Sequence, residues 1–230
     1  MQIFGYPLDV DPILLTLEVA AITTVVLLMI GTPIAWFLSQ MRSRARIFLE
    51  ALVALPLVLP PTVLGFYLII VMNPDGTIAS LLRDIGIHQQ LTFSKTGLVI
   101  GSVVYSLPFT VQPIMAAFEA LPMPIVDAAR TMRAAFFDRF FTVIVPLARQ
   151  GFLVGSVLTF AHTVGEFGVV LMVGGNIEGQ TRTVSIAIFD HVESFEYADA
   201  HMLSIIMVIF SMLVLMFVYA LNRKLQTKQA

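Results

Sequence analysis

Residues 120–148 read ALPMPIVDAARTMRAAFFDRFFTVIVPLA, a polar interval between two long apolar stretches. Its charged residues are Asp127, Arg130, Arg133, Asp138 and Arg139. The neighbouring residues 96–118 contain no charge, and residues 151–173 contain only Glu166. A bundle of membrane helices does not need such a polar interval to fold. We therefore expect an amphipathic segment at the membrane surface that a soluble partner can grip.

The composition of the whole chain is that of an integral membrane protein. Of its 230 residues, 58% are hydrophobic and 12% charged, against roughly 45–50% and 25% in soluble domains. The mean hydropathy is +0.91. Runs of about 20 apolar residues are typical of membrane-spanning helices. Five runs predict an all-α membrane protein of one domain, with spans at about 13–38, 47–72, 96–118, 151–173 and 202–221.

The basic residues predict the orientation, because cytoplasmic loops carry an excess of Lys and Arg. With the N-terminus outside and the C-terminus in the cytoplasm, the inner segments hold Arg42, Arg44, Arg46, Arg130, Arg133, Arg139, Arg149, Arg223, Lys224 and Lys228. The outer segments then hold only Arg83, Lys95 and Arg182. The polar interval 120–148 is therefore expected in the cytoplasm.

Several classes of protein are disfavoured. Cysteine is absent, which excludes disulfides and thiolate metal sites. The first basic residue is Arg42, so the first apolar run reads as a retained span and not as a signal peptide. A net charge of −2 indicates no nucleic-acid partner. In the outer loop 174–200, the apolar residues 183–189 are too short to span, and predict either a re-entrant segment inside the bundle or a surface helix.

Between Pro124 and Pro146 the pattern predicts two short helices joined by a turn. Ala128 and Ala129 leave a smooth face that allows close docking. An apolar face is formed by Phe136, Phe137, Phe140 and Phe141. Two interpretations are open, a docking handle for a soluble partner or an amphipathic segment that lies on lipid headgroups with its arginines snorkelling.

The stretch Asp127-Ala128-Ala129-Arg130-Thr131, closed by Val143-Ile144-Val145-Pro146-Leu147, resembles the cytoplasmic EAA loop of ATP-binding-cassette importer permeases. It departs from that pattern with Asp127 for Glu, Arg133 where Gly is expected, and Val143 and Val145 for bulkier aliphatics. The resemblance implies a helix that docks into an ATPase subunit. The implied coupling residues are Asp127, Ala128, Ala129, Arg130, Thr131, Arg133 and Phe137.

A second resemblance concerns the substrate. Residues 55–61 (LPLVLPP) with Gly65, 162–168 (HTVGEFG) and 175–183 (GNIEGQTRT) are similar to the molybdate permease family, and sulfate permeases share much of the first block. This resemblance implies the five-helix core of a type I importer permease in the bacterial inner membrane. It also implies a homodimer, two cytoplasmic ATPases that bind ATP and Mg, and an extracytoplasmic molybdate-binding protein. Tungstate and sulfate remain alternative substrates.

Other residues suggest a translocation path or its gate. Pro60 and Pro61, with Pro56, can kink a span, although prolines are common in membrane helices. Glu166 is an acid deep in an apolar run, with a gating or a packing role, and Arg182 or a helix N-terminus could pair with it. Arg182 lies between two threonines that could briefly hold a tetrahedral oxyanion, or it is a surface arginine. The expected path residues are Pro60, Pro61, Thr163, Gly165, Glu166, Thr181, Arg182 and Thr183.

The chain lacks the signatures of an enzyme. A phosphate-binding G-x-x-x-x-G-K-[ST] needs a Gly-Lys pair, but Lys95, Lys224 and Lys228 follow Ser, Arg and Thr. Neither G-x-S-x-G nor H-E-x-x-H occurs, and the four histidines show no metal-site spacing, so no metal is predicted. An ion-coupled secondary transporter or channel is the main rival to an ATP-driven permease subunit, and a membrane enzyme ranks third.

Overall fold

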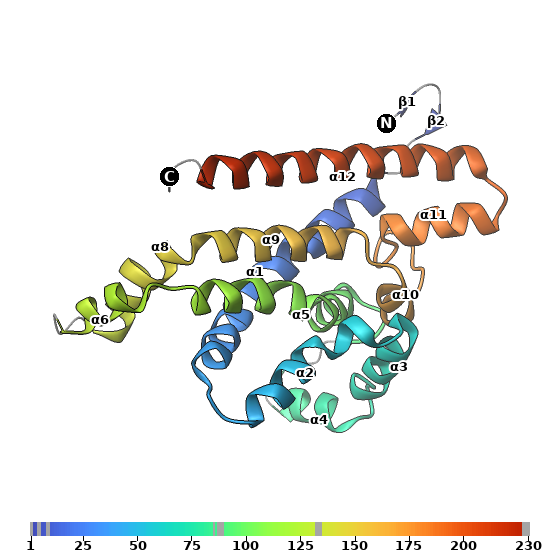
Figure 1. The fold of residues 1–230 in the computed structure, drawn as a ribbon. Helices are drawn as coiled ribbons and strands as arrows, with labels where there is room; N and C mark the ends of the chain where they lie inside the picture. Colours follow the sequence, from blue (N-terminus) through green and yellow to red (C-terminus); the bar gives the residue numbers. More distant parts are fainter. Residues whose placement is uncertain are drawn as a thin grey trace.

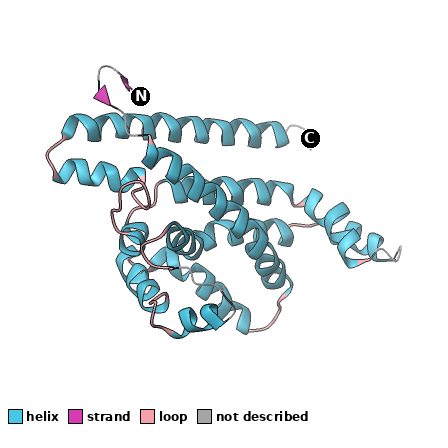
Figure 2. Cartoon of the chain, turned by 180° about the vertical axis from the view of Figure 1, so that it is seen from behind, coloured by secondary structure: helices cyan, strands magenta, loops and turns pink. Residues whose placement is uncertain are grey.

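The computed structural model describes residues 2–3, 6–7, 10–84, 86, 90–131 and 135–226, and these are almost entirely helical (Figures 1 and 2). Its helices are α1 (Asp11–Gln40), α2 (Ala45–Val58), α3 (Pro61–Val71), α4 (Thr77–Asp84), α5 (Lys95–Glu119), α6 (Met123–Thr131), α7 (Phe136–Arg139), α8 (Val145–Leu147), α9 (Arg149–Val164), α10 (Gly168–Gly174), α11 (Val184–Glu193) and α12 (Tyr197–Gln226). A π-helical turn, η1 (Phe140–Ile144), joins α7 to α8. The short strands β1 (Gln2–Ile3) and β2 (Tyr6–Pro7) pair antiparallel.

Three helices are long and apolar enough to cross a membrane singly: α1, α5 and the part of α12 from Tyr197 to Phe217. Two further pairs qualify only together, α2 with α3 and residues 136–147 with α9, and they bend by 109° and 73°. By length and composition the described chain therefore has three to five spans. The range 47–72, expected as one span, breaks before Pro61, because Pro60 and Pro61 have no N–H to donate to the preceding turn.

The core is the packing of α1, α5 and α9 against one another (Figure 1). Along α9 a buried small or hydroxylated residue recurs at every fourth position: Gly151, Gly155, Thr159 and Thr163. A Cβ added to Gly151 would lie 2.4 Å from Cβ of Ala117 and 2.7 Å from the carbonyl oxygen of Pro113, both on α5. Small residues at such positions let two membrane helices approach closely, which replaces the hydrophobic driving force that lipid does not supply.

The start of α10 lies directly against the start of α3. A Cβ added to Gly168 would lie 2.6 Å from Cβ of Pro61, and one added to Gly65 would lie 2.6 Å from Cβ of Met172. The proline break in the α2–α3 pair is thus held in place by a second helix.

Ion pairs link segments at both ends of this bundle. Lys95, at the start of α5, pairs with Glu18 of α1 at 2.7 Å. At the opposite end Arg46 of α2 pairs with Glu50 on the same helix and with Glu119, at the end of α5.

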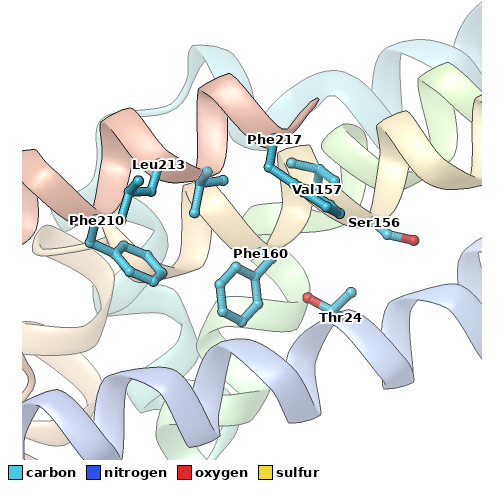
Figure 3. A pocket seen from close by; sticks show the side chains of 8 residues that line it. Thr24, Ser156, Val157, Phe160, Phe210, Leu213 and Phe217 are labelled. Atoms are coloured by element: carbon cyan, nitrogen blue, oxygen red, sulfur yellow. The ribbon is translucent and has the colours of Figure 1, made fainter. Parts of the chain in front are cut away.

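The helices α11 and α12 form a hairpin, and α12 lies on the outside of the bundle in both views (Figures 1 and 2). The apolar residues 183–189 prove to be part of α11, whose Val184, Ile186 and Ala187 are buried against α12 and α1. Farther along, α12 and α9 enclose an apolar cavity of about 520 Å³ with α1 (Figure 3). It is lined by Thr24, Ser156, Val157, Phe160, Phe210, Leu213, Val214 and Phe217.

The close contact of α9 with α5 leads to a test by overpacking. Replacing Gly151 by valine should destabilise the protein by about 1–3 kcal/mol, because the new side chain meets the backbone carbonyl of Pro113 as well as Ala117. Thermal unfolding of the purified protein in detergent measures this.

Gly165→Ala is the matched control. A Cβ at Gly165 would meet only two carbonyl oxygens of its own helix, at 3.7 and 3.8 Å, so its unfolding temperature should stay that of the wild type. Equal unfolding temperatures for Gly151→Val and the wild type would contradict the close packing of these helices.

Candidate functional site

The segment expected to meet a soluble partner lies beyond one end of the bundle (Figure 1). Asp127, Ala128 and Thr131 are exposed on α6, and Ala129 is half-buried. Arg130 belongs to α6, but its side chain lies outside what is described, and Arg133 lies outside the described residues altogether. The exposed small residues give α6 a smooth outward surface.

An aromatic cluster attaches this segment to the bundle. The ring of Trp36, on α1, makes edge contacts with Phe118 of α5 at 5.1 Å, with Phe140 of η1 at 5.7 Å and with Phe136 of α7 at 6.4 Å between centroids. Phe118 also contacts Phe152 of α9 at 5.8 Å. Aromatic pairs of this geometry each add about 0.5–1.5 kcal/mol beyond the area they bury. A displacement of α7 and η1 is therefore felt directly by α1, α5 and α9.

Space remains on both sides of this cluster. Asp127 and Arg139 line a cavity of about 270 Å³ between α6, α7 and the ends of α1 and α5. An apolar cavity of about 460 Å³ lies between α1 and the aromatic residues of α7 and η1. Phe137 is 72% exposed and Phe141 64% exposed, so the segment presents apolar surface beyond what its own packing uses.

A buried line of polar side chains runs between α5 and α9 in the middle of the bundle. Thr110 bonds Thr159, and Ser106 bonds both Thr163, at 3.0 Å, and Nδ1 of His162, at 2.8 Å. Ser102, one turn before Ser106, is fully buried. Hydroxyl pairs of this kind join membrane helices because lipid offers them no other partner.

Glu166 lies where α9 has ended and α10 has not begun. Its side chain is 4% exposed, and its carboxylate oxygens have no hydrogen-bond partner among the described residues. The hydroxyl of Ser102 faces the carboxylate without reaching hydrogen-bonding geometry. The backbone here is held by the Oγ–H of Ser185, which donates to the carbonyl of Glu166. Glu166 is thus a buried acid with its charge unmatched inside the described chain.

The sequence suggested Arg182 as a possible partner of Glu166, but the two residues do not pair. Its guanidinium donates to Asn176 at 2.7 Å and pairs with Asp190 of α11 at 2.9 Å. The helix N-terminus offered as the other partner is not bonded to the Glu166 carboxylate either, as far as the described residues show. The arginine fixes the loop 174–183 on α11.

The two threonines beside Arg182 are also engaged. Thr181 is fully buried and donates to the carbonyl of Gly174 at 2.7 Å, while Thr183 is bonded to Ser185 at 3.2 Å. In this conformation Thr181, Arg182 and Thr183 serve the loop that follows α10. Their hydroxyls and guanidinium are thus bonded within the protein.

The remaining expected path residues gather near Glu166. Gly165 is its neighbour and is exposed, and Thr163 is buried in the α5–α9 line. Pro60 and Pro61 start α3, whose first residue abuts Gly168 of α10. The structure therefore brings the proline break, Thr163, Gly165 and Glu166 into one region. Thr181 and Arg182 lie beyond the far end of α10, whereas Thr183 is linked to the backbone of Glu166 through the hydroxyl of Ser185.

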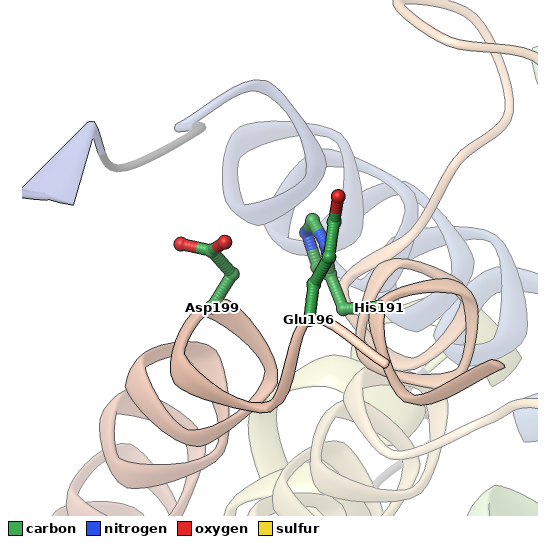
Figure 4. A group of neighbouring side chains, drawn as sticks. All are labelled: His191, Glu196 and Asp199. Atoms are coloured by element: carbon green, nitrogen blue, oxygen red, sulfur yellow. The ribbon is translucent and has the colours of Figure 1, made fainter. Parts of the chain in front are cut away.

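Three potential metal ligands meet at the turn between α11 and α12 (Figure 4). His191 and Glu196 form an ion pair at 2.8 Å, and a carboxylate oxygen of Asp199 lies within 4.8 Å of their ligand atoms. The N–H of Glu196 also donates to the carbonyl of His191. These contacts close the hairpin between α11 and α12.

The family is decided by comparison with known proteins. Residues 19–229 match the model of the family described as "Binding-protein-dependent transport system inner membrane component". The chain belongs to this family. It is 57% identical to the molybdenum transport system permease protein of Azotobacter vinelandii, over 94% of this chain and 95% of that one. It is 36% identical to the corresponding protein of Escherichia coli (strain K12), over 79% of both chains.

More distant relatives have other names. A probable sulfate transport system permease protein of Chlorella vulgaris is 28% identical, over 93% of this chain and 80% of that one. In fold, the chain resembles a crystal structure of a bacterial ABC transporter involved in the import of the acidic polysaccharide alginate. That likeness has a TM-score of 0.74 at 14% identity and covers 94% of this chain and 79% of that chain. As a member of the family, the chain is a membrane-spanning, multi-pass transport component.

Sequence reasoning missed two parts of this site. The sequence around Trp36 does not indicate that this residue packs on α7 and η1. The line between α5 and α9 did leave a signal, since Ser102, Ser106 and Thr110 recur at every fourth residue, as do Thr159 and Thr163. Hydroxyls at that spacing on two apolar helices indicate a shared polar face.

Because the carboxylate of Glu166 is buried without a partner, we expect it to lower the free energy of unfolding. Glu166→Gln should raise the free energy of unfolding by about 1–3 kcal/mol, because the amide keeps the shape of the side chain without the cost of burying an unpaired ionisable group. Thermal or denaturant unfolding in detergent measures the change. Glu178→Gln, at an exposed carboxylate in the loop between α10 and α11, is the control and should change nothing. A less stable Glu166→Gln protein would mean that the carboxylate has a favourable partner, against the geometry described.

Proposed function

We propose that this chain is the permease subunit of an ATP-driven importer that carries molybdate across the bacterial inner membrane. Two copies form the transmembrane pore, two cytoplasmic ATPases bind ATP and Mg, and an extracytoplasmic molybdate-binding protein delivers the anion. The observation that carries the proposal is the 57% identity, over nearly the full length of both chains, to the molybdenum transport permease of Azotobacter vinelandii. The sulfate relatives are less similar, at 28–29%.

The division of labour between subunits rests on the sequence and on α6. The chain has no Gly-Lys pair from which a phosphate-binding loop could be built. It does have an exposed helix, α6, with small residues on its surface, and the segment after it packs its Phe136 and Phe140 on Trp36 of α1. A separate ATPase that binds α6 would move this helix, and the Trp36 cluster would transmit the movement to the spans.

The proposed orientation follows from the same arrangement. The segment α6–α8 lies at the end of the bundle opposite the start of α1 (Figure 1). With α6 in the cytoplasm, the N-terminal end of α1 is outside, in agreement with the excess of basic residues expected on the inner side. Lys95 and Glu18 are then at the outer end, and Arg46 and Glu119 at the inner end.

Reconstitution tests the proposed function. Vesicles that contain the chain with its ATPase and the binding protein should accumulate molybdate only when ATP is supplied on the ATPase side. The chain alone should neither hydrolyse ATP nor accumulate molybdate. Competition with tungstate and sulfate in the same vesicles determines the substrate. Uptake driven by a proton or sodium gradient without the ATPase would contradict the proposal and support the secondary transporter.

A charge on the docking face should separate the ATPase from the permease. In Ala129→Glu a charged side chain replaces a half-buried methyl group on α6, so co-purification of the ATPase should fall about tenfold or more while membrane insertion is unchanged. Ala198→Glu makes the same exchange at an exposed position at the start of α12, at the other end of the bundle, and should leave co-purification intact. Normal recovery of the ATPase with Ala129→Glu would remove α6 from the interface.

A further inference from the structure

His162 is a polar side chain held in a fixed orientation in the middle of the bundle. Its ring stacks on Phe109 of α5, with centroids 4.0 Å apart and planes at 26°, and contacts Tyr105 at 4.8 Å. Nδ1 lies 2.8 Å from Oγ of Ser106, and Ser106 is bonded in turn to Thr163. Stacking fixes the plane of the ring, and Ser106 fixes its rotation in that plane.

This arrangement leaves the opposite edge of the ring free. Ser106 is fully buried, so the Nδ1 edge faces the interior of the bundle and Nε2 faces away from it. Among the described residues the ring is hydrogen-bonded through Nδ1, to Ser106, and the residue as a whole is half-buried. When Thr163 donates to Ser106 and Ser106 donates to Nδ1, the neutral ring carries its proton on Nε2. In this tautomer, which an approaching oxyanion favours, Nε2–H is an available donor.

The surface around His162 is open. Leu158 is 43% exposed, and Ala161 and Gly165 are exposed on the same helix. A Cβ built on Gly165 would find no atom of another element within 4 Å. His162 lies in the middle of the stretch from α9 to α10. Polar residues at such depth rarely face lipid and most often line a substrate pathway.

A neutral hydrogen-bond donor is better suited to a translocation path than to a site that binds the anion tightly. A dianion that meets an arginine is held strongly, whereas conduction needs a site that the ion also leaves readily. Arg182 is committed to Asp190 and Asn176. The Nε2–H group of His162 is then a donor that can guide the substrate without holding it strongly.

We propose that Nε2–H of His162 is a transient contact for the tetrahedral oxyanion on its way through the membrane, with Ser106, Thr163, Tyr105 and Phe109 as the residues that orient the ring. This inference rests on the proposed function, since it assigns a step to a translocated oxyanion. It differs from the site expected at Thr181–Thr183, whose groups are occupied.

Two substitutions at one position test the contact. His162→Phe keeps the ring and its stacking on Phe109 but has no donor, and should lower ATP-dependent molybdate uptake in the reconstituted vesicles by roughly tenfold or more, the size expected for one lost hydrogen bond to a charged group. His162→Gln places an amide N–H near the position of Nε2, and should keep uptake within a few-fold of the wild type. Co-purification of the ATPase should be unchanged in both variants, which shows that the complex is still assembled.

The pattern of the two variants decides the outcome. If His162 only packs, His162→Phe retains the aromatic contacts and transports normally, which overturns the proposal. Equal loss of uptake in His162→Phe and His162→Gln also overturns it, because a donor at the Nε2 position would then not suffice. His201→Phe, at an exposed histidine on α12, is the matched control and should transport as the wild type does. Absence of ATP-dependent uptake in the wild type would instead refute the proposed function, so the two failures are distinguishable.

Discussion

The close approach of α9 to α5 is the constraint on which the rest of the structure depends. Lipid tails are as apolar as leucine, so the two helices gain little by covering apolar surface, and they need tight packing and hydrogen bonds instead. Gly151 supplies the space, because a single methyl group there would collide with Ala117 and with the backbone at Pro113. At this distance the hydroxyls of Ser106 and Thr163 can bond across the contact. The seam between these helices orients His162 and ends next to Glu166.

The same seam connects the membrane core to the segment α6–α8. Phe118 and Phe152, near the α6 ends of α5 and α9, contact each other, and Phe118 contacts Trp36. Trp36 in turn packs against Phe136 and Phe140 of the segment that follows α6. Each contact is weak alone, but together the aromatic rings attach α7 and η1, the elements that follow α6, to three spans. A partner that moves α6 therefore acts on the helices that carry His162 and Glu166.

The elements that the sequence predicted well are those with one strong local signal. The run predicted at 13–38 is α1, and the run at 96–118 is α5, because long stretches without charge have few alternatives to a membrane helix. The fold class is confirmed as that of importer permeases by the comparisons. The range 47–72 was harder: Pro60 and Pro61 indicated a kink, but the 109° bend also depends on α10, which packs on Pro61 through Gly168. Such a contact joins distant residues and has no local signature.

The candidate site likewise contains residues whose setting the sequence could predict and residues whose setting depends on distant contacts. Exposed small residues on α6 could be predicted from the pattern around Ala128, because amphipathicity is a local property. The partner of Arg182 could not, since Asp190 and Glu166 are both acids at reachable separations and only the fold chooses Asp190. Nothing in the sequence around His162 indicates that its ring contacts two aromatic side chains of α5.

The central claim is that α6 is a lever gripped by a separate ATPase, and crosslinking tests it most directly. The chain contains no cysteine, so Ala128→Cys introduces a unique thiol on the exposed face of α6, to which a photoactivated crosslinker can be attached. In membranes that take up molybdate with ATP, the account predicts adducts with the ATPase subunit that change in yield when ATP is added. Adducts with phospholipid alone, while uptake continues, would contradict it.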